Sequence, residues 1–228
     1  DLPTMGSSYE NNVAQIFVND ARHALAFVSD RFYEHPSKSL RLTGITGTNG
    51  KTTLTYLLEA MHAQAGHSCG VIGSINYRFG GQSSPASVTT PQSLDLNCML
   101  AEMVQGGIDP VVMEVSSVGL DQKRVKAVKF DTAIFTNLTR DHLDYHESME
   151  AYGSNKKKLF ASEGLSRAIV NLDDPYALSI INSIAPSVDV CTYSIENSIA
   201  TIHTDSLTLN RQGFEARVIT PIGAGVIK

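Results

Sequence analysis

Short apolar segments alternate with amphipathic segments along most of the chain. The apolar segments have the length of β-strands and occupy residues 42–46, 69–75, 111–115, 132–136, 168–172 and 188–193. The segments between them have the periodicity of helices that bury one face, and they occupy residues 51–65, 93–105, 149–160 and 175–184. Repeated strand, helix and strand units predict an α/β fold with a mainly parallel sheet that helices cover on both faces.

The two ends of the chain follow different patterns. Near the beginning, an apolar stretch at 13–18 and an amphipathic run at 20–32 precede the polar break His35-Pro36-Ser37, which predicts a strand, a helix and a linker. Near the end, no helical pattern separates the apolar segments, so we expect antiparallel strands there. These strands occupy residues 200–203, 206–210 and 214–219, around a turn at 210–213.

The composition is that of an ordinary folded protein: among the 228 residues, 42% are hydrophobic and 18% are charged. The formal net charge of −5 argues against a protein that binds nucleic acid non-specifically. The three cysteines lie far apart and form no CxxC pair, which indicates neither a disulfide framework nor a cysteine zinc site and fits a reducing compartment. No apolar run approaches the roughly 18 residues that span a bilayer, and the start of the chain lacks signal-peptide character. We therefore expect a cytoplasmic protein with no membrane or nucleic-acid partner.

A candidate phosphate-binding loop reads Gly44-Ile45-Thr46-Gly47-Thr48-Asn49-Gly50-Lys51-Thr52-Thr53. It leaves a predicted strand and opens a predicted helix, and its glycines let successive backbone N–H groups face one anion at the helix N-terminus. Lys51 would reach the outer phosphates, and the hydroxyl of Thr52 would bind Mg²⁺. Ile45 stands where the general pattern has glycine, so the strict pattern is not met.

Polar side chains follow two further predicted strands. Glu114 comes near the end of one of them, where ligands gather in open α/β sheets, and it is therefore a candidate magnesium ligand. Residues 137–146, after the next strand, hold an amide, two carboxylates and two histidines. His142 and His146 have a spacing that could hold zinc, but the neighbouring donors are oxygens and no cysteine lies nearby. We therefore favour nucleotide and magnesium chemistry at this edge of the sheet.

Together these motifs resemble the Mur ligase family. The motifs that carry the resemblance are Gly47 through Thr53, Thr89-Thr90-Pro91, Met113 through Ser117, Phe135 through His146, and Tyr152 through Lys156. All five occur in family order with family-like spacing, and the resemblance extends from about residue 31 to residue 223. The family's own phosphate loop shares the departure at Ile45.

The resemblance implies an ATP-dependent ligase of peptidoglycan precursor synthesis, with a part in cell-wall formation, cell shape and cell division. ATP would phosphorylate the terminal carboxylate of UDP-N-acetylmuramoyl-L-alanyl-D-glutamate. The amine of a third amino acid would then attack the acyl phosphate and release phosphate. The implied partners are these small molecules, and the sequence indicates neither which amino acid is added nor the oligomeric state.

The resemblance also assigns roles to individual residues. Those implied to bind ATP are Gly47, Thr48, Asn49, Gly50, Lys51, Thr52, Thr53, Asn137 and Asn171. Those implied to contact the acceptor are Thr89, Thr90, Ser116, Gln122 and Arg124. The implied catalytic residues are Lys51, Glu114, His142 and Lys156. Two magnesium ions are implied, with Thr52 and Glu114 on the first and His142 on the second; Lys156 would carry CO2 as a carbamate, an anionic oxygen donor.

The resemblance divides the chain into residues 1–39, the tail of an N-terminal domain with a linker, and residues 40–228, an ATP-binding central domain. It further implies a fragment, incomplete at its C-terminus and without a third domain, that binds Mg-ATP weakly and does not complete ligation. Val118 stands where this branch of the family usually has histidine. Two alternatives stay open: a relative with other substrates, such as a folylpolyglutamate or cyanophycin synthetase, and a non-catalytic module that senses nucleotide.

Overall fold

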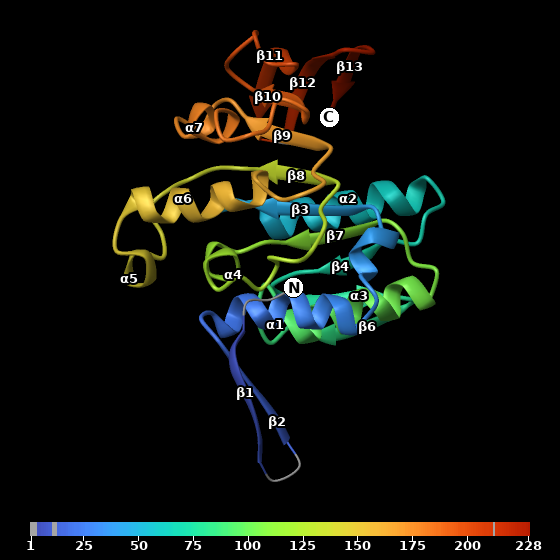
Figure 1. The fold of residues 1–228 in the computed structure, drawn as a ribbon. Helices are drawn as coiled ribbons and strands as arrows, with labels where there is room; N and C mark the ends of the chain where they lie inside the picture. Colours follow the sequence, from blue (N-terminus) through green and yellow to red (C-terminus); the bar gives the residue numbers. More distant parts are fainter. Residues whose placement is uncertain (1–3, 11–12, 212) are drawn as a thin grey trace.

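The structure, a computed structural model, describes residues 4–10, 13–211 and 213–228. Its main feature is an eleven-stranded sheet, and a two-stranded antiparallel ribbon projects from the opposite end of the molecule to the C-terminal strands (Figure 1). The ribbon consists of β1 (Thr4–Glu10) and β2 (Val13–Val18). The strand at 13–18 was predicted, but its partner β1 was not.

The main sheet has the strand order β13-β12-β11-β10-β9-β8-β3-β7-β4-β5-β6. Its strands are β3 (Leu42–Thr46), β4 (Gly70–Ile72), β5 (Asn76–Phe79), β6 (Gln82–Pro85), β7 (Val111–Glu114), β8 (Thr132–Phe135), β9 (Arg167–Asn171), β10 (Asp189–Ser194), β11 (Ile202–Asn210), β12 (Gly213–Thr220) and β13 (Gly223–Ile227). The strands from β11 to β4 pair in parallel, and antiparallel strands extend the sheet at both ends. The predicted mainly parallel sheet is confirmed.

The helices between the strands are α1 (Ala21–Phe32), the 3-10 turn η1 (Pro36–Ser39), α2 (Lys51–Gln64), α3 (Ser93–Gln105), α4 (Ser117–Asp121), α5 (Leu143–His146), α6 (Met149–Phe160) and α7 (Ala177–Ile181). The helices predicted at 93–105 and 149–160 have the predicted bounds. The helix predicted at 175–184 is only five residues long.

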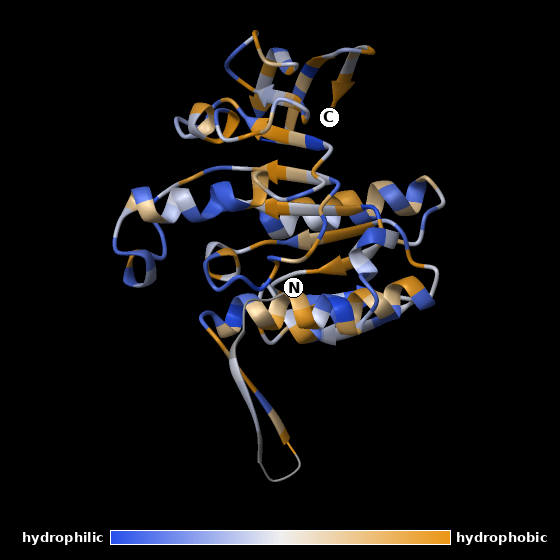
Figure 2. Cartoon of the chain, viewed as in Figure 1, coloured by the Kyte–Doolittle hydropathy of each residue, from blue (hydrophilic) through white to orange (hydrophobic). Residues whose placement is uncertain are grey.

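Both faces of the central strands are buried, as predicted for such a sheet. Ile45, Val112 and Ile134 pack on one face against Leu54 and Leu58 of α2. The opposite face packs against the apolar sides of α3 and α6 in the larger cluster of the core. The central strands are accordingly hydrophobic along most of their length (Figure 2). The core fixes β3 between β7 and β8, with Ile45 beside Glu114 on one side and Ile134 on the other.

The strand predicted at 69–75 is wrong in its second half. β4 ends at Ile72, and the chain turns into the β5–β6 hairpin, which was not predicted. The chain at 73–74 bonds to a buried carboxylate in place of a neighbouring strand: Ser74 N–H donates to Glu114 Oε1 at 2.9 Å, and a Cβ at Gly73 would lie 2.5 Å from the same oxygen. The hairpin turn, Gly80-Gly81, is a sequence signal for such a connection that the helix and strand periodicity overlooks.

The C-terminal strands are antiparallel to one another, as predicted, but β11 also pairs in parallel with β10. The two strands predicted at 200–203 and 206–210 are one strand with a register irregularity between Thr204 and Ser206. β13 was not predicted. Because β11 continues the parallel sheet, the C-terminal strands extend the central sheet and do not form a separate one.

Candidate functional site

The phosphate-binding loop lies between β3 and α2, at the carboxyl ends of the parallel strands. The residues after β8 hold its backbone: Thr48 N–H donates to the Asn137 carbonyl at 2.8 Å, and Asn49 N–H donates to Asn137 Oδ1 at 2.9 Å. Gly47 has a φ of +148°, and a Cβ at this position would collide with the hydroxyl of Thr136. Gly47 is therefore required by both conformation and space.

Asn137 and Asn171 were expected to bind ATP, and the structure gives both another task. Asn137 uses its carbonyl and its side chain to hold the loop. Asn171 Nδ2 donates to the Thr136 carbonyl at 2.8 Å, and its Oδ1 accepts from Asp173 N–H at 3.0 Å. Contact with the nucleotide stays a prediction for both residues.

Two lysines converge on one carbonyl oxygen of this loop. Lys51 Nζ donates to the carbonyls of Gly47 and Thr48, and Lys156 Nζ donates to the Gly47 carbonyl, all at 2.9 Å. Lys156 is only 1% exposed, and neither ammonium pairs with a carboxylate in the described part of the chain. The ammonium of Lys51, with a second amino group beside it and no counter-ion among the described residues, makes a site that an anion would stabilise.

The electrostatic cost of this arrangement appears in the pKa of each lysine. Burial lowers the pKa of Lys51, although the charges of Glu114 and Asp141 oppose the shift. Burial, together with the charge of Lys51, lowers the pKa of Lys156 from 10.5 to about 7. A large fraction of Lys156 is therefore neutral amine near neutral pH.

The expected first magnesium site contains Thr52, Glu114 and a residue that sequence reasoning missed. Glu114 is fully buried and accepts hydrogen bonds from Ser74 N–H at 2.9 Å and Ser74 Oγ at 2.8 Å. Ser74 Oγ also lies 3.3 Å from Thr52 Oγ1. Carboxylate and hydroxyl oxygens are donors that suit Mg²⁺, so this set of groups fits the ion. No motif marks Ser74, since its partner Glu114 is far away in the sequence.

The residues expected at the second magnesium site gather around Tyr152, which the sequence analysis did not assign to the site. Lys156 Nζ lies 4.2 Å from the centroid of the Tyr152 ring, and the His142 ring lies 6.0 Å from it. The Tyr152 hydroxyl lies 3.2 Å from Thr48 Oγ1 in the loop. Among the described residues, no group of three or more His, Cys, Asp or Glu side chains is arranged to hold a metal ion. The role of His142 as a ligand stays a prediction.

Four of the five expected acceptor residues form one hydrogen-bond network. Thr90 Oγ1 accepts from Ser116 N–H at 3.0 Å and lies 3.1 Å from Ser116 Oγ. Arg124 donates to the Thr90 carbonyl at 2.7 Å and, through two nitrogens, to Gln122 Oε1 at 2.6 and 3.1 Å. Thr89 precedes this network in the chain and is half-buried. The network lies next to Glu114, because Thr90 Oγ1 also donates to the Glu114 carbonyl at 3.1 Å.

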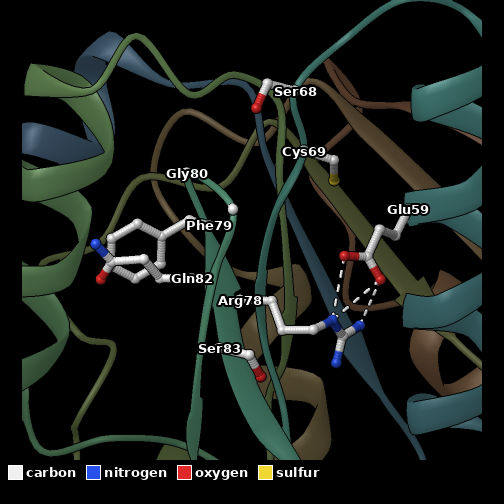
Figure 3. A pocket seen from close by; sticks show the side chains of 9 residues that line it. Glu59, Ser68, Cys69, Arg78, Phe79, Gly80, Gln82 and Ser83 are labelled. Carbon is white, nitrogen blue, oxygen red and sulfur yellow. Dashed lines mark hydrogen bonds and ion pairs between the residues drawn. The ribbon is translucent and has the colours of Figure 1, made fainter.

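A separate cavity of about 270 Å³ lies between the far part of α2 and the β5–β6 hairpin (Figure 3). Arg78 and Glu59 form an ion pair in its wall, with Arg78 Nη2 2.6 Å from Glu59 Oε2. Burial raises the pKa of the Cys69 thiol in the same wall to about 11. The cavity thus contains no reactive thiolate near neutral pH, and none of the predicted site residues lines it.

No helix in the described ranges is both long and apolar enough to cross a membrane.

Comparison with known proteins gives a consistent result. A profile described as the Mur ligase middle domain matches residues 45–228. The UDP-N-acetylmuramoyl-L-alanyl-D-glutamate–2,6-diaminopimelate ligase of Geobacter metallireducens is 42% identical over 214 residues, covering 90% of this chain and 41% of the relative. The ligase of the same name from Pseudomonas aeruginosa is 43% identical over 204 residues, covering 90% and 42%.

Solved structures agree. A structure of a ligase with the same name has a TM-score of 0.83 at 27% identity and covers 93% of this chain and 44% of its own. MurF from Acinetobacter baumannii has a TM-score of 0.69 at 20% identity, a likeness in fold alone, and covers 96% of this chain and 45% of its own. The chain spans about two fifths of the length of the curated relatives it matches. Since the profile matches most of the chain and relatives above 40% identity cover nine tenths of it, the chain belongs to the Mur ligase family.

Proposed function

We propose that this chain forms the ATP-binding part of a ligase that adds the third amino acid to UDP-N-acetylmuramoyl-L-alanyl-D-glutamate. The observation that carries the proposal is the pair of lysines, Lys51 and Lys156, whose amino groups converge on the Gly47 carbonyl with no carboxylate partner among the described residues, so that the ammonium of Lys51 has no paired anion. A polyphosphate would supply the missing negative charge at the place where nucleotides bind in such sheets.

The residues around this pair have separate tasks in the proposed reaction. The N–H groups at the start of α2 and the ammonium of Lys51 would bind the outer phosphates of ATP and stabilise the charge on the transferred phosphoryl group. Thr52 and Glu114 would hold one magnesium ion, with Ser74 fixing the orientation of the carboxylate. When bound, magnesium would neutralise phosphate charge and orient the phosphates.

We further propose that Lys156 reacts with CO2 to give a carbamate, as the family resemblance implies. The support is chemical: only a neutral amine attacks CO2, and burial brings the pKa of Lys156 to about 7. The reaction would also remove one of two adjacent positive charges. In ¹³C-bicarbonate, the parent chain is expected to show a carbamate carbon signal by NMR that Lys156→Met lacks, whether or not the protein ligates. An identical signal in Lys156→Met would contradict the carbamate.

The acceptor would lie beside the network formed by Thr90, Ser116, Gln122 and Arg124. The names of the relatives support 2,6-diaminopimelate as the incoming amino acid. All partners in this proposal are small molecules, and the proposed location is the cytoplasm. In domain terms, residues 1–39 would belong to a preceding domain and its linker, and residues 40–228 to the ATP-binding domain.

The first half of the reaction tests the proposal without the incoming amino acid. With Mg-ATP and UDP-N-acetylmuramoyl-L-alanyl-D-glutamate, hydroxylamine should trap the acyl phosphate as a hydroxamate, together with an equal amount of ADP. Hydroxamate should be absent without ATP and strongly reduced in Glu114→Gln. ADP release that does not depend on the acceptor would contradict a ligase.

A further inference from the structure

Three polar side chains from three helices form a buried chain of hydrogen bonds beside the candidate site. His146, at the end of α5, is 6% exposed. Its Nε2 lies 2.9 Å from Ser117 Oγ, and its Nδ1 lies 3.2 Å from Asn155 Nδ2. Ser117 opens α4 directly after Ser116, and Asn155 precedes Lys156 in α6. His146 thus joins α4, which follows Ser116, to α6, which carries Lys156.

The hydrogen bond between Asn155 and the Ala151 carbonyl favours the tautomer of His146 that has its proton on Nε2. Asn155 Nδ2 also donates to the Ala151 carbonyl at 3.1 Å, so a flipped amide would place its oxygen against that carbonyl. The amide group that faces His146 is therefore a donor, and Nδ1 of the imidazole accepts. The ring proton then lies on Nε2 and is donated to Ser117 Oγ. A neutral ring agrees with the burial of His146, which lowers its pKa.

Aromatic contacts extend this chain to the phosphate loop. The His146 and Tyr152 rings lie 5.2 Å apart at an angle of 30°, and the Tyr152 hydroxyl lies 3.2 Å from Thr48 Oγ1. The Tyr145 ring packs edge-on against His146 at 4.8 Å. A continuous set of contacts therefore runs from Thr48 in the loop through Tyr152 and His146 to Ser117 at the start of α4.

We propose that His146 is a positioning residue that holds α4, and with it Ser116, in a fixed place relative to α6 and the phosphate loop. This inference rests on the proposed function, in which Ser116 lies on the side that holds the reacting carboxylate and the phosphate loop holds the phosphates. α4 has only five residues and is too short to be stable without tertiary contacts. Transfer between bound groups is sensitive to displacements of about 1 Å, so a fixed α4 would favour the reaction.

Two substitutions at the same position separate the hydrogen bonds of His146. His146→Gln can place an amide N–H near the position of Nε2 and keep the bond to Ser117. His146→Asn is shorter, so it can accept from Asn155 but cannot reach Ser117. Ser117→Ala removes the same bond from the other side and leaves the histidine ring in place, which provides a second variant if the first does not fold.

Amide hydrogen exchange of residues 117–124 is the first readout, because it needs no ligand. We expect exchange to be about tenfold faster in His146→Asn and Ser117→Ala, the factor for losing one buried hydrogen bond, and within twofold of the parent in His146→Gln. The amides of β3 should be unchanged in all three variants. Unchanged exchange at 117–124 in His146→Asn and Ser117→Ala, or equal acceleration across the whole chain, would overturn the proposal.

Ligand binding is the second readout. The dissociation constant for UDP-N-acetylmuramoyl-L-alanyl-D-glutamate should rise about fivefold to tenfold in His146→Asn, with rescue in His146→Gln, while that for Mg-ATP stays within twofold. Equal losses for both ligands would indicate a general structural role and would overturn the positioning role. If the parent binds neither ligand, the proposed function fails, and hydrogen exchange alone still decides whether His146 holds α4.

Discussion

The proposed nucleotide side and the proposed acceptor side of the candidate site satisfy their polar groups in opposite ways. On the nucleotide side, Lys51 and Lys156 share one carbonyl and have no carboxylate partner in the described residues. On the acceptor side, Thr90, Ser116 and Arg124 already bind one another or the backbone. The first arrangement leaves the positive charge of Lys51 without a paired anion. The second is already hydrogen-bonded without a ligand. We infer that affinity comes mainly from the nucleotide side, and orientation from the acceptor side.

The largest expected effect concerns the pH dependence of stability, which should come from the nucleotide side. The pKa of Lys156 is 10.5 in the unfolded chain and about 7 in the fold. Between these values the unfolded state binds more protons, so the free energy of unfolding should rise with pH across this window. The contribution of Lys156 to this rise should be on the order of 3 kcal/mol in CO2-free buffer, and Lys156→Met should remove that contribution while leaving the one from the lowered pKa of Lys51.

Urea denaturation at several pH values measures this dependence. The matched control is Lys157→Met, which removes the neighbouring lysine and should keep the rise. A parent whose free energy of unfolding does not change between pH 7 and 10 would mean that burial does not disfavour the charged form of Lys156. That result would contradict the contrast between the two sides.

The next effect concerns the backbone of the phosphate loop. Gly47→Ala should lower the free energy of unfolding by about 3 kcal/mol, because the new Cβ combines an unfavourable φ with a collision at Thr136. Mg-ATP binding should be lost at the same time. Gly81→Ala is the control: its φ is +76° but the space around it is open, so a cost of about 1 kcal/mol is expected. Equal costs at the two positions would show that the close approach of Thr136 is unimportant.

Substitutions on the acceptor side should lower the free energy of unfolding and leave the affinity for Mg-ATP unchanged. Thr90→Val removes a buried hydroxyl that contacts Glu114 and Ser116, so we expect the free energy of unfolding to fall by about 2 kcal/mol. Thr90→Ser should restore most of it. Calorimetry should give Mg-ATP dissociation constants within about twofold of the parent for both variants, since one hydrogen bond here changes no phosphate contact. A much weaker Mg-ATP complex in Thr90→Val would show that the two sides are not separate.

The smallest effect is expected at Ser74, which links the two expected ligands of the first magnesium ion. Ser74→Ala should raise the magnesium concentration needed for half-maximal ATP binding by about fivefold, the effect of one hydrogen bond to a carboxylate. Ser84→Ala, on the exposed strand β6, is the control and should change nothing. The same magnesium dependence of ATP binding in the parent, Ser74→Ala and Ser84→Ala would contradict a role for Ser74 in the site.

Sequence reasoning found the parts of the site that local pattern determines. Lys51 follows a glycine-rich turn between a strand and a helix, and Glu114 ends a buried strand, so both positions follow from the parallel sheet. Ser74 and Tyr152 were missed because their roles depend on contacts between distant segments. Even for His146, which the sequence does single out, only the fold shows that the ring faces Ser117 and Asn155.

The same distinction explains the errors in the fold. The helices α3 and α6 were predicted to the residue. The turn after β4 was not, because it follows from the contact of the chain at 73–74 with Glu114 on a neighbouring strand. Tertiary contact overrides local apolar character at such places.

Calorimetric titration with Mg-ATP, Mg-ADP and AMP tests the central claim, that the unpaired positive charge of Lys51 on the proposed nucleotide side binds the outer phosphates. We expect the folded parent to bind Mg-ATP and Mg-ADP, AMP to bind at least about tenfold more weakly, and Lys51→Ala to weaken Mg-ATP binding by about a hundredfold, with circular dichroism unchanged. A folded parent that binds AMP as tightly as Mg-ATP, or an unchanged affinity in Lys51→Ala, would contradict it.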